Sequence, residues 1–259
     1  MLHTISGPLF RAKVVKRPSS IIKSPYVADI RLDDGRTGLC HTPGLSCSGL
    51  VQAERVIYVN ASKPGAKTAF TAQLAECTDS DGVYYVGIHP MVSQNAARNL
   101  LSHISTEAVW SSEVSIDKHT RIDYLGKLPN GKIIYVEVKT AMISSECSKP
   151  RETRRAIFPD GYRKKITDTI SPRAVKHAET LAELCKDPKT EMCVLLFIVP
   201  RNDCHKGLIL NPADPIYCDA VDKAQHAGVH IRAFALNYAI DGIIQMDKEI
   251  GVIVKSETS

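Results

Sequence analysis

The chain has 259 residues, of which 44% are hydrophobic, 24% charged and 6% aromatic, and 33 basic and 28 acidic side chains give a formal net charge of +5. This composition is typical of a soluble globular protein of one or two domains, and it excludes the collagen-like, disordered and coiled-coil classes. No run of about 18 apolar residues exists, so we expect no membrane span.

The expected location is the cytoplasm, or the nucleus if the source is eukaryotic. Residues 1–11 lack the pattern of a secretory signal. The eight cysteines are scattered without a Cys-x-x-Cys pair, which is typical of reduced thiols rather than of a disulfide framework or a zinc site.

Residues 8–88 carry short β-type runs separated by turn residues, with no convincing helix. The predicted strands are residues 10–16, 26–32, 55–60, 69–76 and 83–88. Several short strands of this kind predict a small closed barrel. An OB-like β-barrel that binds nucleic acid fits residues 1–88, and barrels with other functions fit them as well.

Residues 89–259 show a different pattern, in which helical and strand periodicities alternate. The predicted elements are a helix over 93–104 capped by Ser93, strands over 108–116, 121–125 and 132–140, a helix that begins at Pro172 after the cap Ser171, a buried strand over 192–199, a helix from Pro215 to Ala227 and a final strand over 229–236. This order, αβββαβ and then αβ, predicts an α/β (α+β) domain.

A predicted hairpin brings acidic side chains together. Pro129-Asn130-Gly131 is typical of a three-residue loop, in which a type I turn is followed by glycine in the left-handed conformation. Such a loop pairs Leu128 with Lys132, and counting outward places Asp123 opposite Glu137.

Alternation along the two strands predicts that Arg121, Asp123, Glu137 and Lys139 share one face. The opposite, apolar face would comprise Ile122, Tyr124, Ile134, Val136 and Val138. Facing carboxylates destabilise a solvated sheet, so the acids predict a site for a hard divalent cation such as Mg²⁺, with Lys139 orienting or deprotonating a water for attack on a phosphate. The alternative is that these residues are ordinary polar partners on a half-exposed strand.

An Asp on one strand and Glu-x-Lys on the next, within an αβββαβ order, resemble the PD-(D/E)XK nuclease superfamily. More narrowly, nearly the whole chain resembles the sugar fermentation stimulation protein A (SfsA) family. The segments that carry this resemblance are Ser112-Glu113-Val114, Arg121-Ile122-Asp123-Tyr124, Tyr135-Val136-Glu137-Val138-Lys139, Phe158-Pro159-Asp160 and Arg173-Ala174-Val175-Lys176-His177, and more weakly Lys16-Arg17-Pro18-Ser19 and Cys40-His41-Thr42-Pro43-Gly44.

The resemblance implies a nuclease-like domain with a mixed sheet, an active site at Asp123, Glu137 and Lys139, DNA binding, and a regulatory link to bacterial sugar metabolism. Two departures from the family pattern bear on the DNA contacts more than on the chemistry. His89-Pro90 stands where the family has an Asn-Thr stretch, and the loop between Lys139 and Arg173 is longer than expected.

The positive charge of the chain is concentrated in one segment. Between Lys149 and Lys176, nine Lys or Arg stand against three Asp or Glu. Such a segment predicts a polyanion partner, and it continues onto the polar face of the second predicted helix. The predicted nucleic-acid contacts are Arg154, Arg155, Arg163, Lys164, Lys165, Arg173, Lys176 and His177, and His177 is also a candidate for proton transfer.

Three functions remain open. The first is a metal-dependent deoxyribonuclease in which Asp123, Glu137 and the Val138 carbonyl hold Mg²⁺ or Mn²⁺ and Lys139 positions the attacking water. The second is a non-catalytic DNA-binding regulator of sugar metabolism genes that retains the nuclease fold. The third is a hydrolase of another phosphorylated substrate or a protein-binding scaffold. We expect no organic cofactor and no membrane partner, and the oligomeric state is not defined.

Overall fold

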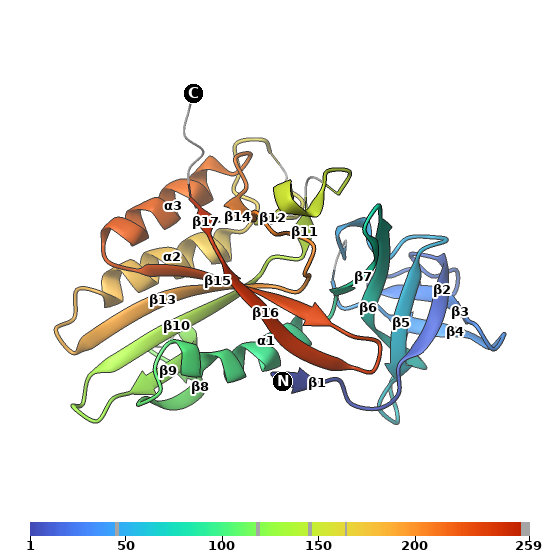
Figure 1. The fold of residues 1–259 in the computed structure, drawn as a ribbon, viewed down its shortest axis with the longest axis horizontal. Helices are drawn as coiled ribbons and strands as arrows, with labels where there is room; N and C mark the ends of the chain where they lie inside the picture. Colours follow the sequence, from blue (N-terminus) through green and yellow to red (C-terminus); the bar gives the residue numbers. More distant parts are fainter. Residues whose placement is uncertain (45–46, 118–119, 145–146, 164, 255–259) are drawn as a thin grey trace.

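The computed structural model describes residues 1–259 except 45–46, 118–119, 145–146, 164 and 255–259. Figure 1 shows two lobes: a curled sheet, and a larger sheet with helices on both of its faces. Within the described residues, no helix has the length and apolar character needed to cross a membrane.

The smaller lobe is a curled six-stranded sheet with the order β4-β3-β2-β5-β6-β7. Its strands are β2 (Phe10–Lys16), β3 (Val27–Leu32), β4 (Thr37–His41), β5 (Val56–Ala61), β6 (Phe70–Asp79) and β7 (Gly82–Gly87). β4 also pairs in parallel with β6, at Cys40↔Phe70 and His41↔Thr71, which closes the curl around an apolar interior. This arrangement confirms the predicted barrel, although the short strand β4 was not predicted.

The larger sheet is mixed and has the order β1-β16-β15-β13-β10-β9-β8. Its strands are β1 (His3–Thr4), β8 (Val109–Ser115), β9 (Arg121–Lys127), β10 (Ile133–Thr140), β13 (Thr190–Val199), β15 (His230–Tyr238) and β16 (Ile243–Ile250). β10, β13 and β15 are parallel neighbours at its centre, and the outer strands pair antiparallel. A central parallel strand is covered on both faces, so the continuous apolar run of β13 is almost entirely buried.

Three helices cover this sheet. They are α1 (Pro90–Leu100), α2 (Pro172–Leu184) and α3 (Pro215–His226). Among the described residues, short 3₁₀ turns lie at η1 (Cys47–Gly49) in the smaller lobe and at η2 (Leu101–His103) and η3 (Arg151–Thr153). α2 and α3 pack on one face of the sheet and α1 on the other, as Figure 1 shows. The succession α1-β8-β9-β10-α2-β13 is the predicted αβββαβ core.

A second, four-stranded sheet was not predicted. It has the order β11-β12-β14-β17, with β11 (Ile143–Ser144), β12 (Arg155–Phe158), β14 (Gly207–Leu210) and β17 (Val252–Ile253). β12 belongs to the basic segment that the sequence predicted to be a loop. The strands of this second sheet are two to four residues long. Strands of that length are too short to show an alternation of apolar and polar residues in the sequence.

Three further predictions differ from the structure. α1 begins at Pro90 rather than after Ser93, because proline is well suited to the first helical position; Ser93 is buried inside the helix and its hydroxyl contacts the Tyr238 hydroxyl at 3.1 Å. β15 is not the final strand, since β16 and β17 follow it. β1 lies in the region predicted as the barrel domain, yet it pairs with β16 of the larger sheet.

A network of charged residues, three of them buried and two partly buried, connects the two lobes. Its members are Asp79 of β6, Arg151, Arg154, Arg201 and Asp203. Arg154 bonds to Asp79 at 2.9 Å and to Asp203 at 2.5 Å, and Arg201 bonds to Asp203 at 2.5 Å. We call these five residues the interlobe network. Because Asp79 comes from the curled sheet and the other members from the larger lobe, the network fixes one lobe against the other.

Candidate active site

The hairpin between β9 and β10 has the predicted loop. The Leu128 N–H donates to the Lys132 carbonyl at 2.9 Å, and the Gly131 N–H donates to the Leu128 carbonyl at 2.9 Å. Gly131 has a φ of +83°, the left-handed conformation that favours glycine. The pairing runs to Tyr124↔Val136, so Asp123 and Glu137 are the next residues along the two strands.

Next to Tyr124, the Asp123 side chain bonds directly to the main chain of β10. Its Oδ2 accepts the Val138 N–H at 2.7 Å, and its Oδ1 accepts the Gln94 side-chain amide of α1 at 3.2 Å. These two bonds use one lone pair of each oxygen and fix the direction of the carboxylate. Gln94 was missed by the sequence analysis because only the packing of α1 against β10 brings it to Asp123, and helical periodicity does not predict that contact.

The strand is distorted at Asp123, and this distortion overturns one predicted face. On β8, Glu113 lies between the pairs Ser112↔Tyr124 and Val114↔Ile122 and has a φ of +54°. Ile122 packs into the core beneath α2 and α3, whereas Tyr124 packs beneath α1. The prediction that they share a face was therefore wrong, because strict alternation holds only along a regular strand.

Glu137 is the most deeply buried charged group of the site, with 2% of its surface exposed. Its Oε1 accepts from the Lys139 ammonium at 2.5 Å and also contacts His177 Nδ1. Its Oε2 is buried without a hydrogen-bond partner among the described residues. A buried carboxylate oxygen with no donor is costly, so Oε2 is an available ligand for a cation.

α2 brings His177 and Arg173 to the same place. The Ser171 hydroxyl caps this helix as predicted, accepting the Ala174 N–H at 3.3 Å. Arg173 Nε donates to His177 Nε2 at 3.3 Å, and His177 Nδ1 contacts both Glu137 Oε1 and, at 3.0 Å, the Lys139 ammonium. His177, Lys139 and Glu137 Oε1 therefore contact one another in a single cluster.

The two carboxylates differ in their electrostatic surroundings. Burial and the nearby negative charge of Glu137 raise the pKa of Asp123 to about 6. Burial acts in the same direction on Glu137, but the contacts with His177 and Lys139 outweigh it and lower the pKa of Glu137 below its usual value. Two neighbouring carboxylates such as Asp123 and Glu137 are stabilised in their ionised forms by a positive charge placed between them.

A pocket of about 280 Å³ opens onto these side chains. Its lining includes Gln94, Asp123, Glu137, Val138, Lys139, Thr140 and Arg173. In the described part of the chain, no set of three or more His, Cys, Asp or Glu side chains is placed so that it could hold a metal ion by itself. Two carboxylates, an oxygen of Glu137 without a donor and the adjacent Val138 main chain nevertheless suit a hard cation that keeps several of its waters, as Mg²⁺ does.

The basic residues predicted to bind nucleic acid are only partly brought to this pocket. Arg173 lines it and Lys176 is exposed on the same helix, as is Lys165 on the preceding segment. Arg163 donates to the Ala213 carbonyl. Arg155 is half-buried, and Lys164 lies outside the described residues.

Arg154 has a different role from the predicted one. It is 1% exposed and belongs to the interlobe network, and it also donates to the Lys149 carbonyl at 2.7 Å. Its guanidinium is therefore held in the protein interior, because two carboxylates neutralise it there. We correct its assignment as a DNA contact to a structural role.

Comparisons with known proteins agree with this architecture. A family model described as the sugar fermentation stimulation protein RE domain matches residues 88–242. Sugar fermentation stimulation protein homologs from Synechococcus elongatus and from a Ruegeria species are 27% and 28% identical to the chain, over 91% of it in both cases and over 92% and 94% of their own lengths.

A solved structure, that of Pyrococcus furiosus SfsA in complex with Ca²⁺, matches with a TM-score of 0.74 at 22% identity, covering 97% of this chain and 98% of that one. This likeness shows a shared fold across both lobes. Because the family model spans more than half of the chain, the protein belongs to the sugar fermentation stimulation protein (SfsA) family.

Proposed function

We propose that this protein is a metal-dependent phosphodiesterase that acts on DNA. The observation that carries the proposal is the convergence of Asp123 and Glu137 on one pocket, with a buried Glu137 oxygen that has no donor and the Lys139 ammonium 2.5 Å from the other oxygen. Carboxylates and a lysine in this arrangement serve hydrolysis of phosphate esters at a divalent cation.

The ligands in this proposal are Asp123, Glu137 and the main-chain carbonyl of Val138, and the cation is Mg²⁺ or Mn²⁺. The relative from Pyrococcus furiosus was solved with Ca²⁺, another hard cation that prefers oxygen ligands. When bound, such a cation supplies a Lewis acid for the phosphate and lowers the pKa of a coordinated water.

The remaining side chains of the pocket have distinct tasks in the reaction. Lys139 positions the attacking water, whose oxygen forms the new bond to phosphorus while one ester bond breaks and the leaving oxygen takes up a proton. Gln94 holds Asp123 in place, and His177 together with Lys139 keeps Glu137 ionised. Arg173, exposed beside the pocket, binds a neighbouring phosphate as a charge-assisted donor.

DNA is the proposed polymer because the excess of positive charge lies next to the pocket. Arg173 and Lys176 on α2 and Lys165 before it present exposed cations. Binding through such phosphate contacts weakens steeply as salt rises. Replacing Lys165, Arg173 and Lys176 by Gln should lower the affinity for all sequences to a similar extent and flatten the salt dependence.

The test is cleavage of single- and double-stranded DNA in Mg²⁺ or Mn²⁺ by the wild type, with Asp123→Ala as the inactive control. We expect metal-dependent cleavage by the wild type that Asp123→Ala lacks. Equal traces of cleavage from both proteins in every condition would refute the enzymatic part. Tight, salt-sensitive DNA binding without cleavage would favour the alternative, a non-catalytic DNA-binding regulator that retains the nuclease fold.

A further inference from the structure

A second cavity adjoins the catalytic pocket. It has a volume of about 610 Å³ and lies between the loop after β4, at Gly44 and Cys47, and the larger lobe. Thr140, at the end of β10, lines both this cavity and the catalytic pocket. The two pockets are therefore neighbours, separated by the end of β10.

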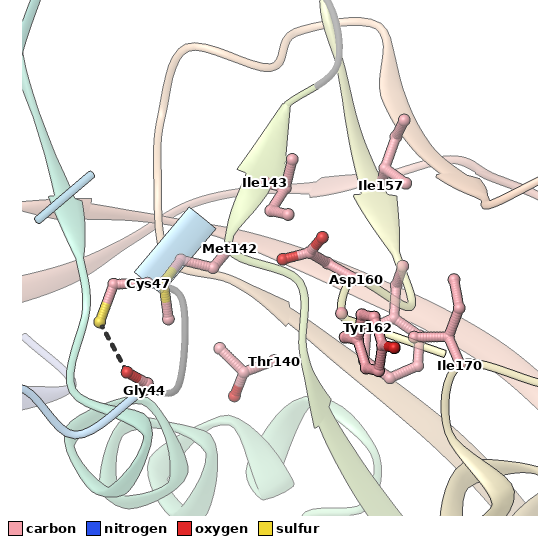
Figure 2. Close-up of a pocket in the computed structure, with 11 residues that line it drawn as sticks. Gly44, Cys47, Thr140, Met142, Ile143, Ile157, Asp160, Tyr162 and Ile170 are labelled. Atoms are coloured by element: carbon pink, nitrogen blue, oxygen red, sulfur yellow. Dashed lines mark hydrogen bonds between the residues drawn. The ribbon is translucent and has the colours of Figure 1, made fainter. Parts of the chain in front are cut away.

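The walls of the cavity are mostly apolar. Met142, Ile143, Ile157 and Ile170 surround it, and Figure 2 shows their side chains together with the Tyr162 ring at one side. Tyr162 is 79% exposed. The polar groups of the lining are fewer and include the Thr140 and Tyr162 hydroxyls and the Asp160 carboxylate, which points toward the cavity in Figure 2. A volume between about 300 and 1,000 Å³ with apolar walls and few polar groups is typical of a small-ligand site.

Segments far apart in the sequence are built around this cavity. Gly44 ends the segment Cys40-His41-Thr42-Pro43-Gly44, and Phe158-Pro159-Asp160 forms part of the opposite wall. Arg17 ties the loop down, since its guanidinium donates to the carbonyls of Gly44 at 2.5 Å and of Val51 at 3.4 Å. Three segments that carry the family resemblance thus meet here, and none of them contributes a ligand to the proposed metal site.

We propose that this cavity receives one unpaired nucleobase of the DNA strand whose phosphate lies at Asp123 and Glu137. The inference rests on the proposed function, because it takes the strand at the catalytic pocket as given. A nucleobase has flat apolar faces, which suit the isoleucines and the Tyr162 ring, and an edge with N–H donors, which suits Asp160 and Thr140.

A base in this cavity cannot remain paired, because its Watson–Crick edge faces protein. The protein should therefore prefer single strands, or duplexes with an unpaired nucleotide, over fully paired DNA. The difference in affinity between the single strand and the duplex reflects the free energy needed to unpair and unstack one base of the duplex before it can enter the cavity. Stacking of one base on a protein side chain corresponds to a change in affinity of about tenfold or more.

The experiment measures affinity by fluorescence anisotropy in Ca²⁺, with gels to verify that the DNA stays intact. The probes are one labelled oligonucleotide as a single strand, the same strand in a duplex, and single strands with an abasic site walked along the sequence. The variants are Ile170→Trp, which fills the cavity, and Tyr162→Ala, which removes the exposed ring and is expected to fold. The matched control is Ile240→Trp, at a half-exposed isoleucine outside the cavity lining.

We expect the wild type and Ile240→Trp to bind the single strand about tenfold more tightly than the duplex, with one abasic position that costs about the same factor. Ile170→Trp and Tyr162→Ala should lose this preference and keep the duplex affinity. An unchanged preference in both variants, or equal wild-type affinity for all probes, would overturn the cavity assignment. If the wild type cleaves DNA in Mg²⁺ but shows no preference, only this inference falls; if it neither binds nor cleaves DNA, the proposed function falls with it.

Discussion

Replacing Asp203 with Asn removes one negative charge from the interlobe network at almost unchanged side-chain volume. Asp203 is completely buried and accepts from Arg201 Nε at 2.5 Å, from Arg201 Nη2 at 2.7 Å and from Arg154 Nη1 at 2.5 Å. Arg154 and Arg201 are each 1% exposed, so neither guanidinium can turn to water when the carboxylate is lost. The Tyr84 ring lies under both, at 5.7 and 5.6 Å, and offers only a partial substitute.

The magnitude follows from the cost of leaving buried charges without a partner. Breaking a buried ion pair by removing one member costs about 3–5 kcal/mol. For a chain of this size that corresponds to a fall in Tm of roughly 10 °C. The matched control is Glu54→Gln, which breaks the exposed Lys13–Glu54 pair at 3.1 Å and should change stability by less than about 1 kcal/mol.

The assay is urea unfolding followed by far-UV circular dichroism, together with a thermal scan of each variant. An Asp203→Asn protein within about 1 kcal/mol of the wild type would refute the reasoning, because the network would then contribute no more than an exposed pair does. The same comparison tests the structural role of Arg154, because an arginine that served only to contact DNA would not make the stability of the fold depend on Asp203.

Four further changes have defined outcomes. Ca²⁺ at about 100 times its Kd should stabilise the wild type by about 2.7 kcal/mol in a thermal scan and leave Asp123→Asn unaffected. Gly131→Ala should cost about 1 kcal/mol in urea unfolding, because alanine at a φ of +83° is strained although no atom lies within 4 Å of the added carbon. Ser171→Ala should cost about 1 kcal/mol in the same assay through loss of the α2 cap. The hydrogen bond from Arg151 lowers the pKa of Asp79 in the folded state. The ionised carboxylate therefore stabilises the fold above the unfolded-state pKa near ~4, and this contribution is lost as the pH falls further. Asp79→Asn should accordingly show a flatter acid unfolding profile between pH ~4 and ~2.

The local parts of the site could be predicted from the sequence because local chemistry determines them. Pro129-Asn130-Gly131 sets the hairpin loop, and the loop sets the register that leads to Asp123 and Glu137. Ser171 marks the start of α2 by capping it, accepting from Ala174, and Pro215 marks the start of α3, which Asp214 caps by accepting from Tyr217. Each of these features depends on residues within a few positions of one another.

The features that escaped prediction depend on distant parts of the chain. Arg154 looked like a surface cation until Asp79 and Asp203 were found beside it, 75 and 49 positions away in the sequence. His177 was expected on a DNA-binding face, and only the packing of α2 against β10 shows that it contacts Glu137. Periodicity carries no record of such contacts, because it reports which face is buried and not what lies against it.

The central claim is that Asp123 and Glu137 together hold a divalent cation. Anomalous diffraction from a crystal soaked in Mn²⁺ tests it most directly, with an Asp123→Ala crystal soaked in the same solution as the control. The account predicts an anomalous peak in contact with oxygens of Asp123 and Glu137 and with the Val138 carbonyl, which is absent from the variant. A peak that persists in the variant, or a wild-type pocket without a peak at saturating Mn²⁺, would contradict it.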